Sequence, residues 1–293
     1  MSRARIIILT SLAMLAFAGN SLLCRVALKN TGIDPASFTS VRLISAALTL
    51  WLVVRVNSKT NSGEGNWPSA FALFAYAAGF SFAYVNLSAA TGALLLFGAV
   101  QTTMIGFGIW RGERLRILQL SGLLLALGGL VGLTFPGLSA PPLLSSLLMM
   151  GAGAAWGIYS LRGKGAGDPT LVTAGNFLRT VPITIALSLL MVTQIAWDSA
   201  GIWYAIISGA LTSGVGYAIW YKALPALKAT QAETVQLSVP VIAAIGGIIL
   251  LDEPITLRVI LASIAIISGI ALVILEKKKS NDAQQVTPEL PLS

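Results

Sequence analysis

The sequence predicts an all-α integral membrane protein with ten transmembrane helices, arranged as two inverted five-helix repeats. Of its 293 residues, 56% are hydrophobic and only 10% are charged, whereas a soluble domain carries roughly 25% charged residues. The mean hydropathy is +0.82. The apolar residues form long runs separated by short polar connections, and the pattern of these runs repeats within the chain.

Each apolar run has the length of a membrane-spanning helix, which requires about 20 mostly apolar residues. The runs do not alternate as the strands of a membrane barrel do, so helices are predicted. Asp-Pro or Glu-Pro pairs punctuate three connections, at 34–35, 168–169 and 253–254. The predicted spans are 6–28, 36–56, 68–88, 91–110, 117–135, 142–162, 170–195, 200–221, 229–251 and 257–275.

The internal repeat relates the two halves of the chain. The later parts of the halves align at an offset of 140, which pairs Leu87 with Leu227, Gly106 with Gly246 and Glu113 with Glu253. The earlier parts align at an offset of 137, which pairs Arg25 with Arg162 and Arg42 with Arg179. Because five is odd, the copies enter the bilayer in opposite orientations. We therefore predict one repeat over 1–138 and a second over 139–276, an architecture typical of secondary transporters.

Basic residues predict the orientation of the spans. Alternate connections hold 14 of the 19 lysines and arginines, and an excess of these residues marks the cytoplasmic side. Both termini are thus predicted to be cytoplasmic in a multi-pass protein of the inner membrane. The polar segment 277–293 is predicted to be a disordered cytoplasmic tail.

Composition also argues against several functional classes. The single cysteine, Cys24, excludes an internal disulfide, and the absence of histidine removes the commonest metal ligand and general base. We expect no metal, no cofactor and no enzymatic activity. The net charge of +8 follows the positive-inside pattern, so no nucleic-acid partner is expected. Arg3, Arg5 and the following apolar run imitate a signal peptide, but cleavage would leave the first repeat incomplete.

The ninth span and its exit carry the most specific local pattern. It reads Ala229-Thr-Gln-Ala-Glu-Thr-Val-Gln-Leu-Ser-Val-Pro240, followed by Leu250-Leu-Asp-Glu253-Pro254. This pattern resembles the drug/metabolite transporter superfamily, EamA type, over essentially residues 5–276. The resemblance implies a ten-helix basket with a central cavity lined by both repeats, and export of amino acids, metabolites or drugs.

Arg42 and Arg179 lie inside predicted spans, each 17 residues after its matched arginine, Arg25 or Arg162. An arginine near the bilayer centre costs at least about 2.5–3.5 kcal/mol on insertion scales, so it should face a cavity or a partner. Either arginine could bind the carboxylate of a substrate. The alternative is structural, in which the side chain bonds helix-end carbonyls or reaches the membrane surface.

Glu233 is the one carboxylate well inside a predicted span. Desolvation would favour its protonated form, which suits proton coupling. A permanent ion pair with Arg179, Arg42 or Lys228, or contact with water, is the alternative. The family pattern usually has an uncharged residue near this position, so the resemblance assigns Glu233 no role.

Pro240 interrupts the ninth span and frees the backbone carbonyl of Gln236. The kink could act as a hinge or present Gln236 to substrate, or it could be static. Other intramembrane polar and aromatic residues are candidates for cavity walls; we select Asn20, Tyr84, Gln101, Trp156 and Tyr217. Three further aromatic residues lie nearer span ends, where an interfacial aromatic belt explains them better: Trp51, Trp220 and Tyr221.

Together these patterns predict a secondary active transporter of small organic metabolites, and the resemblance implies export. The two repeats would alternate around a central cavity, with possible proton coupling. A passive channel, facilitator or exchanger is the alternative. The expected partners are a small-molecule substrate, protons and the lipid bilayer, and the protein could be a monomer or a homodimer.

Overall fold

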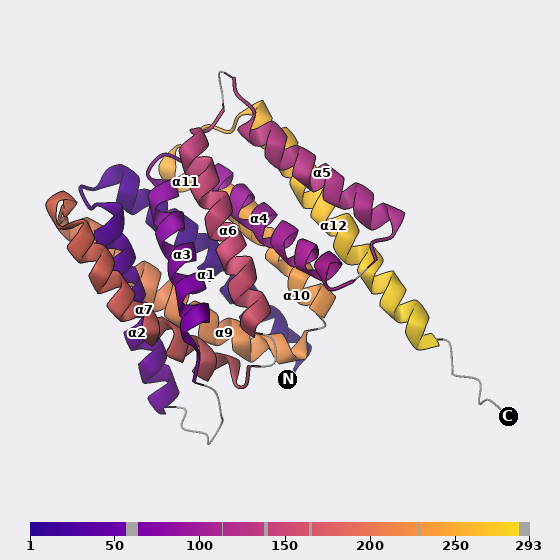
Figure 1. The fold of residues 1–293 in the computed structure, drawn as a ribbon, viewed down its shortest axis with the longest axis horizontal. Coiled ribbons are helices and arrows are strands. Elements are labelled where there is room, and N and C mark those ends of the chain that lie inside the picture. The colour runs from indigo at the N-terminus through magenta and orange to yellow at the C-terminus, as the bar shows by residue number, and fades with distance from the viewer. Residues whose placement is uncertain (57–63, 113, 138–139, 164–165, 228, 287–293) are drawn as a thin grey trace.

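The protein is a bundle of helices (Figure 1), seen in a computed structural model. The structure describes residues 1–56, 64–112, 114–137, 140–163, 166–227 and 229–286, with the side chains of 229–231, 233 and 276–286 left aside. Every regular element among these residues is helical.

The first half of the chain forms five helices, which follow the predicted spans. Their bounds are α1 (Arg3–Asn30), α2 (Pro35–Val56), α3 (Trp67–Tyr84), α4 (Ala89–Trp110) and α5 (Ile117–Thr134). The second half is divided into a larger number of shorter helical segments. It comprises α6 (Leu143–Gly163), α7 (Pro169–Leu190), η1 (Val192–Gln194), α8 (Ser199–Ile207), η2 (Ser208–Val215), α9 (Gly216–Ala223), η3 (Leu224–Ala226), α10 (Ala229–Gln236), α11 (Ser238–Leu251) and α12 (Leu257–Val286).

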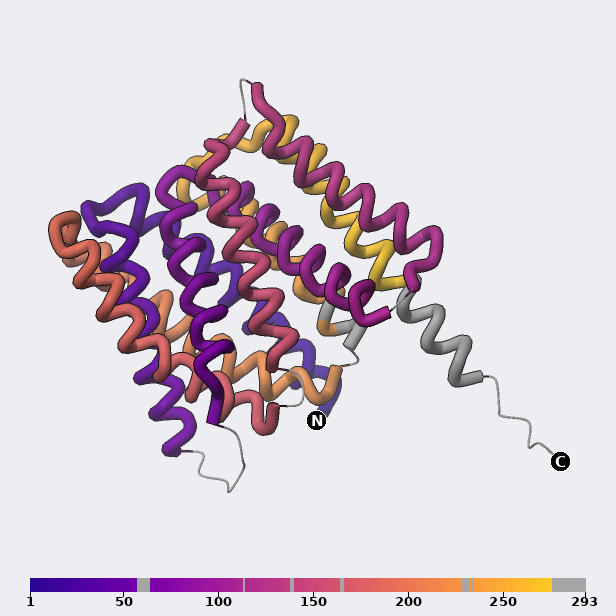
Figure 2. The backbone as a smooth tube through the Cα atoms, viewed as in Figure 1, coloured from indigo at the N-terminus to yellow at the C-terminus, as the bar shows by residue number. Residues whose placement is uncertain are grey.

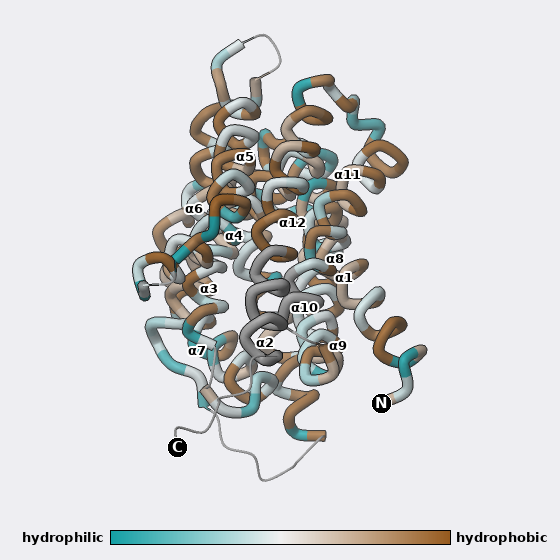
Figure 3. Tube along the Cα trace, turned by 90° about the vertical axis from the view of Figure 1, so that its right-hand side faces the viewer, coloured by the Kyte–Doolittle hydropathy of each residue, from teal (hydrophilic) through white to brown (hydrophobic). Residues whose placement is uncertain are grey.

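Nine helices in the described part of the chain are long and apolar enough to cross a membrane, and hydrophobic stretches recur throughout the bundle (Figure 3). The predicted span at 68–88 corresponds to α3, which is shorter and contains Tyr76, Ser81 and Tyr84. These polar groups explain why α3 falls outside the nine. α12 overlaps the first part of the predicted tail, and residues 287–293 lie outside the described residues.

The helices pack as a central group with one peripheral pair. α1 runs through the group and contacts the segment from α8 to α9, as well as α4 and α11. Around it, α3 packs on α6 and α7, and α2 packs on α7 and η2. α5 and α12 lie against each other at one side of the bundle (Figure 2).

The predicted eighth span contains a π-helical segment, η2, where α2 approaches closely. A Cβ atom at Gly209 would overlap the carbonyl oxygen of Arg42 and the hydroxyl of Ser45, so only glycine fits there. Such π segments inside helices are frequent at functional sites. Gly209 therefore allows η2 to pack directly against the backbone that carries Arg42.

The predicted ninth span is divided into α10 and α11 at Leu237. Pro240 lies in the first turn of α11, where its missing N–H donor is tolerated. The break between the helices thus lies next to Gln236. Pro240 was predicted to leave the backbone carbonyl of this residue without its helical hydrogen bond.

Asp34 begins α2 and joins it to the connection before α8. Its Oδ1 accepts hydrogen bonds from the backbone N–H groups of Ala36 and Ser37, both at 2.9 Å. Its Oδ2 accepts one from Ala196 at 3.0 Å. Partial burial would raise the pKa of Asp34, but the hydrogen bonds from Ser37, Ala196 and Ala36 outweigh it and lower the pKa.

Candidate functional site: a central cavity closed at one end

A cavity of about 400 Å³ lies in the centre of the bundle, which is within the usual size range of small-molecule sites. Residues of α1, α4, α6, α7, α9 and α10 line it. Its aromatic walls are Phe17, Trp156, Tyr159, Tyr217, Trp220 and Tyr221. Its polar groups are the side chains of Gln101, Ser160, Thr173, Asn176 and Gln236.

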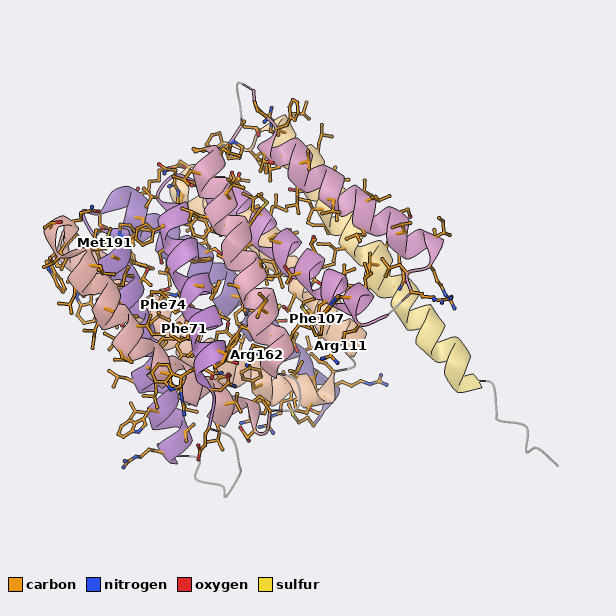
Figure 4. All side chains as sticks on the ribbon, in the orientation of Figure 1. Phe71, Phe74, Phe107, Arg111, Arg162 and Met191 are labelled. Atoms are coloured by element: carbon orange, nitrogen blue, oxygen red, sulfur yellow. The ribbon has the colours of Figure 1, made fainter. Side chains whose placement is uncertain are left out.

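The cavity extends to the connection from α6 to α7, which lies at the end of the bundle where α1 begins (Figure 1). Gly163, Gly167 and Pro169 form part of its lining, and they belong to the connection from α6 to α7 at that end. Arg162 lies nearby at the end of α6 (Figure 4) and donates hydrogen bonds from Nε to Ser69 (3.3 Å) and from Nη2 to Asn66 (3.4 Å). These contacts attach the end of α6 to the start of α3.

Aromatic rings form the inner wall of the cavity. The ring of Phe17 lies 6.2 Å from Trp156 and 5.5 Å from Tyr217, measured between centroids. Trp156 also stacks on Tyr76, at 5.4 Å with an interplanar angle of 24°. Beyond these rings is a second space of about 10 Å³, lined by Asn20, Tyr76 and neighbouring residues, and that is roughly the volume needed for one water molecule.

Asn20 is the centre of a buried polar network behind this wall. Its Nδ2 donates to the Tyr76 hydroxyl at 3.3 Å. Its Oδ1 accepts from the hydroxyl of Ser208 at 2.7 Å and from that of Thr212 at 3.4 Å. The network therefore joins α1, α3 and η2 at mid-bundle, as expected for a buried amide whose polar atoms must be satisfied.

Arg42 reaches the same network from α2. Its side chain is 2% exposed, and its Nη2 donates to the Tyr76 hydroxyl at 3.2 Å. The guanidinium carbon lies 5.5 Å from the centroid of the Tyr76 ring and 4.8 Å from that of Phe80. Within the described part of the chain, Nε and Nη1 of Arg42 have no hydrogen-bond partner.

An ion pair lies at the end of the bundle opposite the cavity mouth. Arg25 Nε lies 2.8 Å from Glu253 Oε1, and the side chains are 12% and 7% exposed. Glu253 Oε2 also accepts from the backbone N–H of Ala89 at 2.7 Å, at the start of α4. Arg25 Nη1 donates to the carbonyl oxygens of Tyr84 and Val85, both at 2.9 Å.

The local backbone explains how Glu253 is positioned. Asp252 ends α11 in the left-handed conformation, with φ of 50°, and the N–H of Glu253 donates to the carbonyl of Gly247 at 3.1 Å. This turn directs the Glu253 carboxylate back into the bundle. Lys29 adds a further contact from α1 to the Leu251 carbonyl, at 3.2 Å.

The predicted site residues are divided among these regions. Gln101, Trp156, Tyr217 and Gln236 line the large cavity, and Asn20 lines the small one, which Trp156 and Tyr217 share. Arg42 lies behind the aromatic wall, in contact with Tyr76.

Two predicted residues lie elsewhere. Arg179 donates to the carbonyl oxygens of Glu64 and Gly175 and is not part of the cavity lining, an arrangement that matches the structural alternative. Tyr84 is fully buried and packs on Phe80 at 4.7 Å, near the closed end. The backbone of Glu233 lies in α10, but its side chain is outside the described residues.

Sequence reasoning missed several residues of the site. Phe17 and Tyr76 were not selected, although Tyr76 is a tyrosine in the middle of a span and could have been found on that signal. Trp220 and Tyr221 were assigned to an interfacial belt, whereas both line the cavity. Both residues lie in α9, which contributes to the cavity lining, and their position near a span end could not reveal this.

Comparisons with known proteins agree with this architecture. The model of the EamA-like transporter family matches residues 143–275. Uncharacterized protein PA1977 of Pseudomonas aeruginosa is 55% identical over 271 residues, 92% of this chain and 94% of that protein. Uncharacterized transporter YoaV of Bacillus subtilis is 23% identical, over 81% of this chain and 86% of its own length.

Two further similarities concern a named exporter and a solved fold. Threonine/homoserine exporter RhtA of Escherichia coli K12 is 30% identical over 125 residues, 42% of each chain. A crystal structure aligns with a TM-score of 0.66 at 17% identity, covering 94% of this chain and 99% of that one. The chain therefore belongs to the drug/metabolite transporter superfamily and is an EamA-type, multi-pass membrane transporter with a small-molecule substrate.

Proposed function

We propose that this protein is a secondary transporter that exports small organic metabolites, such as amino acids or related compounds, by alternating access. The observation that carries the proposal is the cavity of about 400 Å³ that reaches one end of the bundle, while the Arg25–Glu253 pair closes the other end. A carrier needs a site that communicates with one side at a time.

The proposed orientation places both termini in the cytoplasm and the protein in the inner membrane. It rests on the basic residues, 14 of 19 of which fall in alternate connections, by the positive-inside rule. The cavity mouth lies at the end where α1 begins, so in this orientation the cavity faces the cytoplasm. A cavity open to the cytoplasm is the state that loads substrate for export.

The packing of the helices supports two inverted repeats as the moving units. By their order in the repeats, α1 corresponds to α6, and α3 corresponds to the α8–η2–α9 segment. The contact between α3 and α6 therefore has a counterpart in the contact between α1 and the α8–η2–α9 segment, and both contacts are extensive. Two further contacts join corresponding helices of the two repeats, α2 with α7 and α5 with α12. Paired contacts of this kind are expected in a carrier in which one repeat rocks against the other.

The cavity lining supports small organic molecules with an apolar part as substrates. The lining combines six aromatic side chains with five uncharged polar side chains, a composition typical of sites that orient a ligand with few polar contacts. The partial similarity to a threonine/homoserine exporter is compatible with amino acids. Proton coupling through Glu233 is proposed from its position inside a span and from the presence of α10 at the cavity.

The test is uptake of labelled metabolites, weighted toward amino acids, into proteoliposomes with and without an imposed pH gradient. Glu233→Gln is measured in parallel. We expect gradient-driven accumulation by the native protein and its loss in Glu233→Gln. Equilibration that ignores the gradient and the substitution would contradict proton coupling and favour a facilitator or exchanger.

A further inference from the structure

Arg42 is a buried cation without an anionic partner in the described part of the chain. Its side chain is 2% exposed, and Nε and Nη1 have no hydrogen-bond partner among the residues that the structure describes. Its third nitrogen, Nη2, donates a hydrogen bond to the Tyr76 hydroxyl at 3.2 Å. The rings of Tyr76 and Phe80 offset part of the charge, but they supply no acceptor for the two remaining donors.

An unpaired charge in a low-dielectric interior is costly, and buried donors without partners add to that cost. A carboxylate at this position would accept from the free guanidinium donors and neutralise the charge. Such charge-assisted hydrogen bonds are about twice as strong as neutral ones. The site around Arg42 therefore favours binding of an anion, and the described residues of the protein do not supply one.

Two side chains in contact, Tyr76 and Trp156, link Arg42 to the large cavity. Tyr76 contacts Arg42 through its hydroxyl and stacks by its ring on Trp156, which lines the cavity. The space of about 10 Å³ behind Trp156 is lined by Tyr76 and Asn20. A displacement of the Tyr76–Trp156 stack would therefore connect this space, and Arg42 beyond it, to the cavity.

We propose that Arg42, with Asn20 and the Tyr76 hydroxyl beside it, forms a carboxylate-binding subsite for organic acids whose apolar or aromatic body occupies the aromatic cavity. This deepens the proposed function and rests on it for the identity of the ligand as substrate. Arg42 holds the charged group, the Tyr76–Trp156 stack moves to admit it, and the rings of Phe17, Trp156 and Tyr217 contact the body.

The experiment compares matched pairs of probes that differ in charge but little in shape. The pairs are 3-phenylpropionate with 3-phenylpropionamide, and N-acetylphenylalanine with its amide. Binding to the full chain in lipid nanodiscs is measured by calorimetry. We expect each carboxylate to bind at least about tenfold more tightly than its amide, the preference that one charge-assisted contact supplies.

Substitutions assign that preference to Arg42. Arg42→Gln should abolish it, whereas Arg179→Gln, which removes the matched arginine that bonds backbone carbonyls, should leave it intact. If Arg42→Gln fails to fold, Arg42→Lys serves instead, because it keeps the charge but loses the planar set of donors. It should weaken carboxylate binding several-fold and leave amide binding unchanged.

Equal binding of carboxylates and amides by the native protein would overturn the subsite, as would an unchanged preference in folded Arg42→Gln or Arg42→Lys. An equal loss in Arg179→Gln would overturn the assignment to Arg42. Uptake assays of the metabolite panel distinguish a failure of the subsite from a failure of the proposed transport function. Transport without carboxylate preference removes the subsite alone, whereas Arg42-dependent binding without any transport removes the proposed function alone.

Discussion

Arg25 and Glu253, separated by 228 positions in the sequence, form a largely buried ion pair of 2.8 Å. Glu253 also accepts from the start of α4, and Arg25 also donates to the end of α3. The pair therefore joins four helices at one end of the bundle. In an alternating carrier this junction must separate when the cavity opens to that end, so its strength sets the balance between the two states.

Breaking the Arg25–Glu253 pair should expose the end that it closes. The single cysteine, Cys24, is fully buried beside Arg25 and provides a native reporter. In Glu253→Gln we expect Cys24 to react with a maleimide about tenfold faster than in the native protein, because removing one charge from a buried pair is strongly destabilising. The control is Glu64→Gln, at an exposed carboxylate. Equal rates in both variants would show that the pair does not keep this end closed.

Two glycines of α6 provide a matched test of helix packing. A Cβ at Gly153 would lie 2.5 Å from the Leu96 carbonyl oxygen and 2.7 Å from the Ala99 Cβ, whereas a Cβ at Gly151 meets nothing within 4 Å. Gly153→Ala should therefore destabilise the protein by about 1–3 kcal/mol through overpacking. Gly151→Ala should be neutral or stabilising by up to about 1 kcal/mol. Thermal unfolding in detergent measures both, and equal shifts would contradict the packing of α6 on α4.

The Asp34 cap should make stability depend on pH. Because the folded-state pKa of Asp34 is lowered, its contribution is present above the ordinary pKa of about 3.9 and is lost as the pH falls through the folded-state value. Asp34→Ala should cost about 1 kcal/mol at pH 7, and the difference should shrink below about pH 4. Solvent screening keeps the pH-dependent part small, since the carboxylate is only partly buried.

A second substitution separates the charge of this cap from its geometry. Asparagine also caps helices, so Asp34→Asn should lose less stability than Asp34→Ala and show a flatter pH dependence. Melting temperatures of both variants between pH 3 and pH 7 provide the comparison. A pH-independent difference between the native protein and Asp34→Ala would contradict the role of the Asp34 charge.

Trp156 should be required for substrate affinity. It contacts Phe17, Tyr76 and Phe97 and lines both cavities. Trp156→Ala should raise the KM for transport by about tenfold or more, because it removes a central aromatic contact surface. Trp203→Ala is the matched control, since Trp203 is 64% exposed on the outside of the bundle. A KM that changes equally in both variants would place substrate outside this cavity.

The sequence was sufficient for the helical class and for most span positions, because membrane-spanning helices must be long and apolar regardless of their neighbours. The breaks were harder to predict. Pro240 indicated an interruption of the ninth span, but the division falls at Leu237, before the proline. The π-helical segment at Ser208–Val215 packs against Arg42 and Ser45, which are more than 160 positions away in the sequence, so no local pattern indicates it.

The two arginines illustrate the same limit at the site. Arg42 and Arg179 have matching sequence contexts, and charge alone could not separate a binding residue from a structural one. In the fold, Arg179 donates to the Glu64 and Gly175 carbonyl oxygens. Arg42 instead faces Tyr76 and Phe80, and two of its donors have no hydrogen-bond partner among the described residues. That difference arises from the neighbouring helices and is invisible in the local sequence.

The most direct test of alternating access is counterflow in proteoliposomes. Vesicles loaded with an unlabelled amino acid transported in the uptake panel are diluted into a trace of the same labelled compound, and the initial rate of label entry is compared with that of empty vesicles. We predict a several-fold acceleration and a transient accumulation of label, because a carrier returns its site faster when loaded. A rate that is independent of internal substrate would contradict alternating access and identify a passive channel.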